Sequence, residues 1–183
     1  GLHFGVAAAK KMKRLQNILP LAQKAGLNFK GLEWLACVAV LLMDSAEGLQ
    51  SVVMDRLNLT PHERRTVADS LSALPQIKQF FNLKKTFKNS EVYLFLEPYA
   101  LVPLLYCWAT VNRRQARRWI AHHATFLARL RGELTGEDLL EMKCSPGPWL
   151  GSILEGIRLE RMDGRITTRA EELDYVKENM MRA

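Results

Sequence analysis

The stretch Asn112–Arg131, NRRQARRWIAHHATFLARLR, decides the fold class. Its apolar residues recur every three or four positions, which is the spacing of one face of an α-helix. The stripe consists of Ala116, Trp119, Ile120, His123, Leu127 and Leu130. Asn112 followed by Gln115 is typical of a helix start, and Gly132 ends the pattern. We therefore predict an amphipathic helix over Asn112–Arg131, with its apolar side against a core.

The rest of the chain carries the same helical period, and little of it alternates as a strand does. An almost wholly apolar helix is predicted over Leu32–Met43, with Trp34 deep in the core. Thr60-Pro61-His62-Glu63 starts another helix, which we expect to stop at Pro75. Near the N-terminus, a basic amphipathic stretch carries Lys10, Lys11, Lys13 and Arg14. The sequence predicts an all-α protein.

The character of the chain changes at Gly132. Long helical patterns precede it, whereas short elements follow it, separated by glycines and prolines. We therefore predict a helical body domain over residues 1–131 and a small helical tail domain over residues 132–183. A segment of about fifty residues buries a low fraction of its surface. We expect the tail to dock on the body through a stripe formed by Leu150, Ile153, Leu154 and Ile157.

Composition limits the class of protein and of partner. Apolar residues make up 48% of the 183 residues, which is enough for a packed core. The net charge of +7 favours an anionic partner, although a basic excess that only keeps the protein soluble is the alternative. The apolar runs are too short to span a bilayer, so no membrane partner is expected. Three widely spaced cysteines suit a reducing, cytoplasmic location.

Three blocks of the tail form a recognisable pattern. They are LTGEDLL at Leu134–Leu140, PGPWLGSIL at Pro146–Leu154, and DGRI at Asp163–Ile166 followed by TRAEEL at Thr168–Leu173. In this order and spacing they resemble the C-terminal tail of class II tRNA nucleotidyltransferases (CCA-adding, A-adding and C-adding enzymes) and of related bacterial poly(A) polymerases. Upstream, RLNLT at Arg56–Thr60 resembles the helical body of that family.

The resemblance implies that the chemistry of the family takes place in an N-terminal head, where paired aspartates hold Mg²⁺ and ATP or CTP is the substrate. Such two-metal transfer needs clustered carboxylates. In this chain, the close acidic residues lie in or near first turns of predicted helices, where they stabilise the helix. They are Glu137, Asp138, Glu141, Glu171, Glu172 and Asp174. We therefore expect no catalytic residue, metal site or cofactor in this chain. We interpret it as an RNA-binding C-terminal region separated from its head.

Basic residues are the candidates for contact with RNA. Arg113, Arg114, Arg117 and Arg118 crowd the start of one predicted helix, where mutual repulsion and the helix dipole both disfavour them unless a phosphate lies between. A solvated face paired with acids from elsewhere is the alternative. The resemblance implies a backbone-clamping role for the tail around the acceptor and elbow side of tRNA. Its candidate residues are Lys143, Ser145, Gly147, Trp149 and Arg165.

Three functions stay open from the sequence. The first is a tRNA-binding body and tail that position the 3′ end for the head. The second is the same architecture in a poly(A) polymerase, which grips less specific RNA. The third is a helical scaffold or dimerisation module that binds no RNA. In each case we expect core phenylalanines and solvated lysines in the segment Lys78–Lys88, rather than a base-stacking platform.

Overall fold

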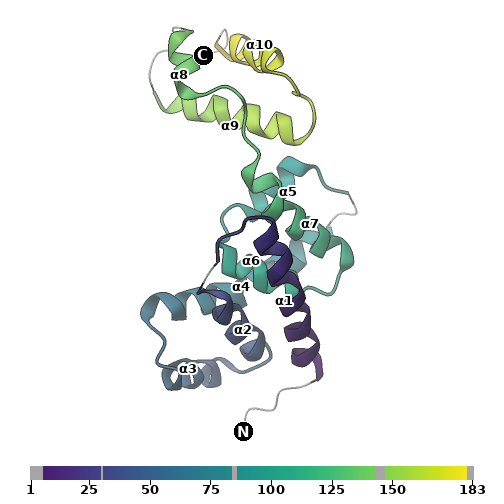
Figure 1. Ribbon diagram of the computed structural model, residues 1–183, viewed down its shortest axis with the longest axis vertical. Coiled ribbons are helices and arrows are strands. Elements are labelled where there is room, and N and C mark those ends of the chain that lie inside the picture. Colours follow the sequence, from purple (N-terminus) through teal and green to yellow (C-terminus); the bar gives the residue numbers. More distant parts are fainter. Residues whose placement is uncertain (1–5, 30, 84–85, 143–146, 181–183) are drawn as a thin grey trace. The chain divides into compact units, whose positions relative to one another are not determined.

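The computed structural model describes residues 6–29, 31–83, 86–142 and 147–180. All regular secondary structure in these ranges is helical, as Figure 1 shows, which confirms the predicted all-α class. The chain divides into two compact units. Unit 1 comprises Gly1–Thr86 and Phe95–Thr125, and unit 2 comprises Phe87–Leu94 and Phe126–Ala183. The predicted boundary at Gly132 stays a prediction. The second part of unit 2 starts at Phe126, and its first part is the earlier segment Phe87–Leu94.

Unit 1 is built around one almost fully buried helix, α6. It packs against α1, α2, α4 and α7, and its buried side chains include Leu105, Tyr106 and Cys107. Burial of each large apolar side chain contributes roughly 1.5–3 kcal/mol, so α6 supplies much of the core of this unit. The helices of unit 1 are α1 (Val6–Lys24), α2 (Glu33–Leu42), α3 (Glu47–Arg56), α4 (Pro61–Leu83), α6 (Leu101–Thr110) and α7 (Arg114–Thr125).

Unit 2 has its own core between three short helices. Leu139, Ile157 and Val176 are fully buried there. The stripe that we expected to dock on the body, Leu150, Ile153, Leu154 and Ile157, contributes to this core. Its docking on the body stays a prediction. The elements are α8 (Gly136–Glu141), α9 (Pro148–Met162), α10 (Arg169–Met180), the short 3-10 helix η1 (Leu127–Arg129) and the first part of α5 (Asn89–Leu96).

Threonine caps start several of these helices. Thr135 accepts a hydrogen bond from the Asp138 amide, while the Asp138 carboxylate accepts one from the Thr135 amide at 2.7 Å. The same reciprocal pattern joins Thr60 to Glu63 and Thr168 to Glu171. Each pattern satisfies two backbone donors that a helix start leaves free. The predicted helix start at Thr60 is therefore confirmed.

The prediction that Pro75 ends its helix is wrong. Helix α4 continues through it to Leu83, because Ile77 and Phe81 extend the buried stripe of Val67 and Leu74 beyond the proline. A proline inside a helix costs about 3 kcal/mol. Burial of two further large side chains on the same face offsets a cost of that size.

The prediction that Trp34 lies deep is also wrong, since 40% of this residue is exposed. Helix α2 is apolar on all sides, so its sequence does not show which side meets the core. In the structure, Leu35, Val38 and Leu42 are buried, whereas Trp34 is on the less buried side.

Candidate nucleic-acid interface

The four arginines predicted to contact RNA divide into two pairs. Arg114 and Arg118 on α7 are exposed, and their side chains make no hydrogen bond or ion pair with the described part of the chain. Arg113 and Arg117 are half-buried and hold structural positions. Arg113 precedes α7 and donates to the carbonyl of Phe81, with the Asn82 side-chain oxygen 3.4 Å away. The first pair is available to a ligand, whereas the second is engaged by the protein.

Arg117 binds the C-terminal end of α6. Its guanidinium donates to the carbonyl oxygens of Val111 at 3.1 Å and Asn112 at 2.7 Å. From α1, Arg14 donates to Val111 at 3.1 Å and to Ala109 at 3.0 Å. The last carbonyls of a helix lack partners within it and carry its negative dipole end, which explains why two cations meet there. Burial, together with the charges of Arg14 and Arg114, lowers the pKa of Arg117.

Exposed cations neighbour Arg14 and Arg117 on their own helices. On α1, Lys10 lies one turn before Arg14, and Lys13 is its neighbour; both are exposed. On α7, Arg114 lies one turn before Arg117, and Arg118 directly follows it. We call Lys10, Lys13, Arg114 and Arg118 the basic face. The predicted RNA contacts do not include its two lysines, which belong to the basic run at Lys10–Arg14.

The positive charge of the chain is concentrated in unit 1. Unit 1 contains 16 Lys and Arg residues against 7 Asp and Glu, a net charge of +9, whereas unit 2 contains 10 against 12, a net charge of −2. A net positive surface raises the local concentration of a polyanion, and a net negative one does not. A polyanion would therefore be attracted to unit 1 more than to unit 2.

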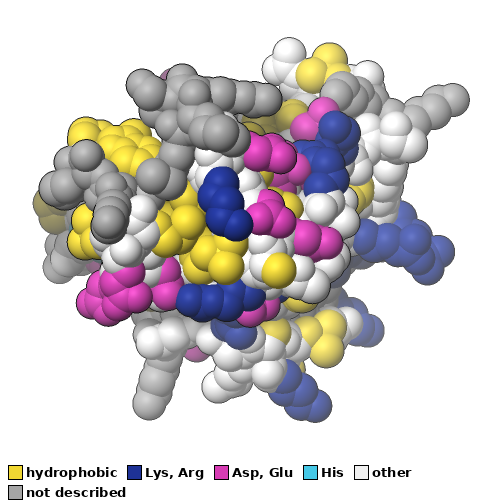
Figure 2. All heavy atoms as spheres, turned by 90° about the horizontal axis from the view of Figure 1, so that it is seen from above, with side chains coloured by type: hydrophobic (Ala, Val, Ile, Leu, Met, Phe, Trp, Pro, Cys, Tyr) yellow, Lys and Arg dark blue, Asp and Glu magenta, His cyan; other side chains and the backbone are white. Residues whose placement is uncertain are grey.

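The arginines of unit 2 are largely neutralised by carboxylates. Arg165 binds both carboxylate oxygens of Glu160 and lies 3.1 Å from Asp163, and the hydrogen bonds to Glu160 raise its pKa. Arg169 lies 2.5 Å from Asp138. On the face in Figure 2, Lys and Arg side chains likewise lie beside Asp and Glu side chains instead of forming a continuous basic patch.

The remaining predicted tail residues lie at the start of α9. Gly147 is the N-cap residue, and Trp149 is half-buried against the core of unit 2. A Cβ atom on Gly147 would lie 3.0 Å from Cδ1 of Trp149, so the glycine leaves room for the ring. Lys143 and Ser145 lie outside the described residues. Contact of these tail residues with RNA stays a prediction.

Two buried charged residues hold unit 2 together. The sequence pattern did not predict this role for either of them. Arg158 donates to the carbonyls of Leu130 at 2.8 Å and Ala128 at 2.9 Å, and it lies over the ring of Tyr93, 4.2 Å from the centroid. The Tyr93 hydroxyl accepts a further hydrogen bond from it. Arg158 thereby joins α9 to η1 and to the α5 segment.

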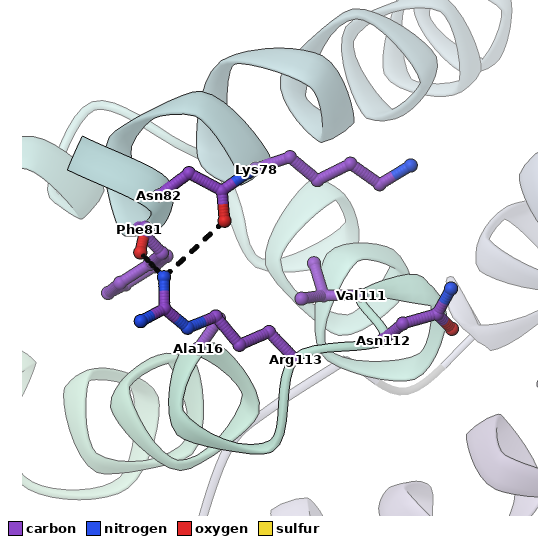
Figure 3. Close-up of a pocket in the computed structure, with 7 residues that line it drawn as sticks. All are labelled: Lys78, Phe81, Asn82, Val111, Asn112, Arg113 and Ala116. Carbon is purple, nitrogen blue, oxygen red and sulfur yellow. Dashed lines mark hydrogen bonds between the residues drawn. The ribbon is translucent and has the colours of Figure 1, made fainter. Parts of the chain in front are cut away.

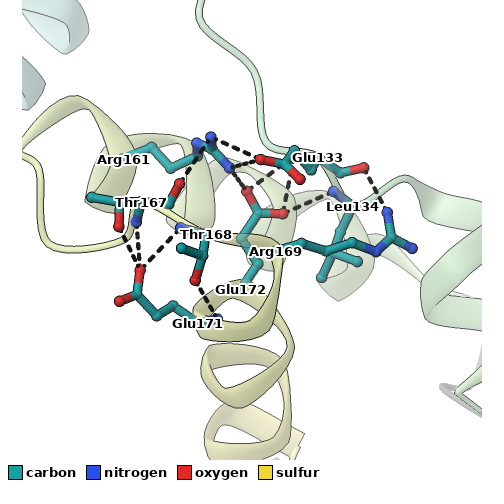
Figure 4. A network of polar contacts seen from close by, with 8 residues as sticks. All are labelled: Glu133, Leu134, Arg161, Thr167, Thr168, Arg169, Glu171 and Glu172. Carbon is teal, nitrogen blue, oxygen red and sulfur yellow. Dashed lines mark hydrogen bonds and ion pairs between the residues drawn. The ribbon is translucent and has the colours of Figure 1, made fainter.

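Glu172 is the second of these residues, and Figure 4 shows its network. Its buried carboxylate accepts hydrogen bonds from the amides of Glu133 at 3.0 Å and Leu134 at 2.8 Å, and it pairs with Arg161. Burial pushes the pKa of Glu172 up, but the bonds from Glu133, Arg161 and Leu134 outweigh it, so the pKa is lowered. The structural interpretation of Glu172 accords with these contacts.

The described residues lack a cluster of metal ligands and a single helix that could span a membrane. They contain no group of three or more His, Cys, Asp or Glu side chains that could hold a metal ion. Within the same ranges, no single helix has the length and hydropathy to cross a membrane, although α5 and α6 would meet that test together as a bent pair.

Two curated proteins are similar to the chain, and no protein-family model matches it. An A-adding tRNA nucleotidyltransferase of Geobacter sulfurreducens is 25% identical over 122 residues, which cover 64% of this chain and 14% of that protein. A CC-adding tRNA nucleotidyltransferase of Synechocystis sp. is 26% identical over an alignment of 188 residues, covering 97% of this chain and 43% of that protein. The predicted resemblance to tRNA nucleotidyltransferases is confirmed.

Solved structures with the same fold are CCA-adding enzymes. The Thermotoga maritima enzyme complexed with tRNA matches 98% of this chain with a TM-score of 0.70 and 17% sequence identity. An apo form of a CCA-adding enzyme matches 97% with a TM-score of 0.69 and 17% identity. The chain spans less than half the length of each of these relatives and structures, for example 43% of the Thermotoga chain.

Proposed function

We propose that this chain is the tRNA-binding region of a tRNA nucleotidyltransferase, and that it holds tRNA while a catalytic head outside this chain adds nucleotides to the 3′ end. The curated relatives and the fold support this assignment. Mg²⁺ and ATP or CTP are expected of the head. Because the described residues offer no metal-ligand cluster, no step of nucleotide transfer is assigned to them.

The basic face carries the proposal. Arg114 and Arg118 are exposed and unengaged by the described chain, and they lie in the unit that holds a net charge of +9. Arginine side chains bind phosphate through several N–H donors at once. Double-stranded RNA is recognised mainly through its shape and backbone. We therefore propose that the basic face binds phosphates of a tRNA helix without reading its sequence.

Seven of the nine predicted RNA contacts have a part in this proposal, while Lys143 and Ser145 lie outside the described residues. Arg114 and Arg118 contact phosphate directly, while Arg113 and Arg117 hold α7 in place. The tail residues Gly147, Trp149 and Arg165 have protein contacts that support a structural part in unit 2. The lysines of α1, Lys10 and Lys13, join the direct contacts.

Salt-dependent binding of tRNA to the whole chain tests the proposal. Each phosphate neutralised contributes about 0.9 to the slope of log affinity on log salt. The double variant Arg114→Ala/Arg118→Ala should weaken binding and flatten this slope by about 1 to 2. Arg56→Ala/Arg65→Ala removes two exposed arginines from α3 and α4 of the same unit and serves as the matched control.

The two variants separate specific contact from general attraction. We expect the control to keep most of the affinity and slope of the wild type. Equal losses in both variants would mean that net charge alone, and not the basic face, attracts RNA. If the chain did not bind tRNA even at low salt, the proposal would be overturned, and the scaffold alternative would remain.

A further inference from the structure

A pocket of about 250 Å³ lies in unit 1 beside α7. Figure 3 shows α4 on one side of it and the start of α7 on the other, with Arg113 reaching across to the Phe81 carbonyl and the Asn82 side chain. Its volume is below the ~300 Å³ at which pockets for drug-sized ligands begin. The pocket therefore suits a single small group. Its lining residues are Lys78, Phe81, Asn82, Val111, Asn112, Arg113 and Ala116.

The lining combines an apolar floor with a polar and cationic rim. Phe81, Val111 and Ala116 are almost fully buried and form the floor. Asn82 and Asn112 are exposed carboxamides, and each offers both hydrogen-bond donors and an acceptor. No acidic residue is among the described residues that line the pocket. This lining matches a flat ring that has donors and acceptors on its edge.

The rim favours a nucleotide over a bare phosphate. A phosphate accepts hydrogen bonds only, so it would leave the side-chain oxygen of Asn112 unused, whereas a nucleobase both donates and accepts. The Asn82 oxygen already accepts from Arg113, which leaves the Asn82 amide group to donate. The Arg113 guanidinium is held by Phe81 and Asn82, which fixes its plane at the pocket wall. Unstacked bases of RNA are bound by such guanidinium planes and by edge hydrogen bonds. Lys78 supplies a positive charge for the attached phosphate.

We propose that this pocket binds one unstacked nucleotide, with its base between Asn82 and Asn112 and its phosphate at Lys78. That the nucleotide belongs to a bound RNA rests on the proposed function. Arg113 thereby gains a direct part in binding beside its structural one. The basic face would hold the duplex backbone, and the pocket would hold one base outside the duplex.

Titration of the whole ¹⁵N-labelled chain with AMP, CMP and inorganic phosphate tests the pocket by NMR. We expect either nucleotide to shift the amides of residues 78–82 and 111–116 in a saturable manner, and inorganic phosphate to bind at least about tenfold more weakly. Asn82→Ala/Asn112→Ala should reduce nucleotide affinity on the order of tenfold. Asn17→Ala/Gln79→Ala removes two exposed carboxamides outside the pocket and should leave it unchanged.

The outcomes are independent of tRNA binding by the basic face. Nucleotide binding that needs Asn82 and Asn112 supports the pocket even if the proposed tRNA function fails. Equal affinity for inorganic phosphate would show that the pocket is only a phosphate site and would overturn the proposal. The absence of saturable amide shifts, while tRNA still binds, would also overturn it. In tRNA titrations, Asn82→Ala/Asn112→Ala should lower affinity without changing the salt slope, because no charge is removed.

Discussion

Arg14 on α1 and Arg117 on α7 donate to the same carbonyl oxygen, that of Val111, each at 3.1 Å. Two residues far apart in the sequence therefore meet at the end of α6. Like charges so close would repel one another without a shared acceptor. The C-terminal dipole of α6 and three carbonyls at its end supply that compensation.

Replacing Arg117 should affect stability more than binding. Arg117→Ala removes two hydrogen bonds from a half-buried cation, so we expect a loss of about 1–2 kcal/mol in the free energy of unfolding. Urea denaturation measures this loss. Arg118→Ala, one residue on and exposed, should stay within about 0.5 kcal/mol of the wild type. If Arg118→Ala proved the more destabilising variant, the structural assignment of Arg117 would be wrong.

Two glycines of α9 should respond oppositely to alanine. A Cβ atom on Gly156 would overlap the hydroxyl of Tyr175 on α10, so Gly156→Ala should cost about 1–3 kcal/mol. Gly151 has no atom within 4 Å of such a Cβ, and Gly151→Ala should stabilise by roughly 0.5–1 kcal/mol through helix propensity. Urea midpoints of both variants measure the difference, and the same sign of change in both would contradict the packing of α10 on α9.

Unit 2 should lose stability in acid. The pKa of Glu172 is lowered in the folded chain, so its stabilising effect is full above about pH 4.5, the ordinary value, and is lost as the pH falls through the folded value. Hydrogen bonds from Thr135 and the Arg169 guanidinium lower the pKa of Asp138 to about 2. The loss of stability in acid therefore continues down to about pH 2. Thermal unfolding measured between pH 7 and pH 2 should show this decline.

Glu172→Gln isolates the buried carboxylate. Removing one partner of a buried pair costs about 3–5 kcal/mol. The variant should be less stable at pH 7 and show a shallower decline in acid. Glu178→Gln, on the exposed side of α10, is the control and should follow the wild type at every pH. An acid profile of Glu172→Gln identical to that of the wild type would show that Glu172 does not contribute to it.

Truncation of the chain after Arg131 should destabilise α5. The truncated chain lacks Arg158, which binds Tyr93, and Asp163, which accepts a hydrogen bond from the Ser90 amide at 2.9 Å. Hydrogen exchange over residues 87–94 should therefore become fast, while α6 of unit 1 stays protected as the internal control. Unchanged protection of residues 87–94 would show that unit 2 is not needed to hold them. Loss of protection in α6 would show that unit 1 does not fold without the tail.

The chain alone should transfer no nucleotide. The described residues contain no cluster of carboxylates for metal ions, which nucleotidyl transfer of this kind requires. Incubation with tRNA lacking its terminal adenosine, radiolabelled ATP and Mg²⁺ should give only background incorporation. Activity that copurifies with the chain through two different columns would refute this prediction.

Local patterns predicted the elements that depend on local chemistry. The threonine cap at Thr60 and the buried stripe from Ala116 to Leu127 were predictable because caps and helical period are short-range signals. The predictions for Pro75 and Trp34 were wrong for one shared reason. Whether a helix survives a proline, and which side of an apolar helix is buried, depends on partners distant in the sequence.

The candidate site was predictable as a basic cluster but not in its internal division. Sequence places Arg113, Arg114, Arg117 and Arg118 together, and nothing local distinguishes the two that bind backbone carbonyls from the two that face solvent. That difference depends on Phe81 and Val111, which only the folded unit brings near. The contacts of Arg158 with Tyr93 and Leu130 were equally beyond sequence patterns.

The central position of α6 has a consequence for how the chain is made. Because a ribosome releases a protein from its N-terminus, α1, α2 and α4 emerge before Leu101–Thr110, the helix on which all three pack. Their apolar faces must wait, exposed to solvent and to other nascent chains, until α6 leaves the exit tunnel. Exposed apolar surface of this kind is what molecular chaperones bind. The interval between the emergence of α4 and that of α6 is thus a period in which nascent unit 1 is prone to aggregate.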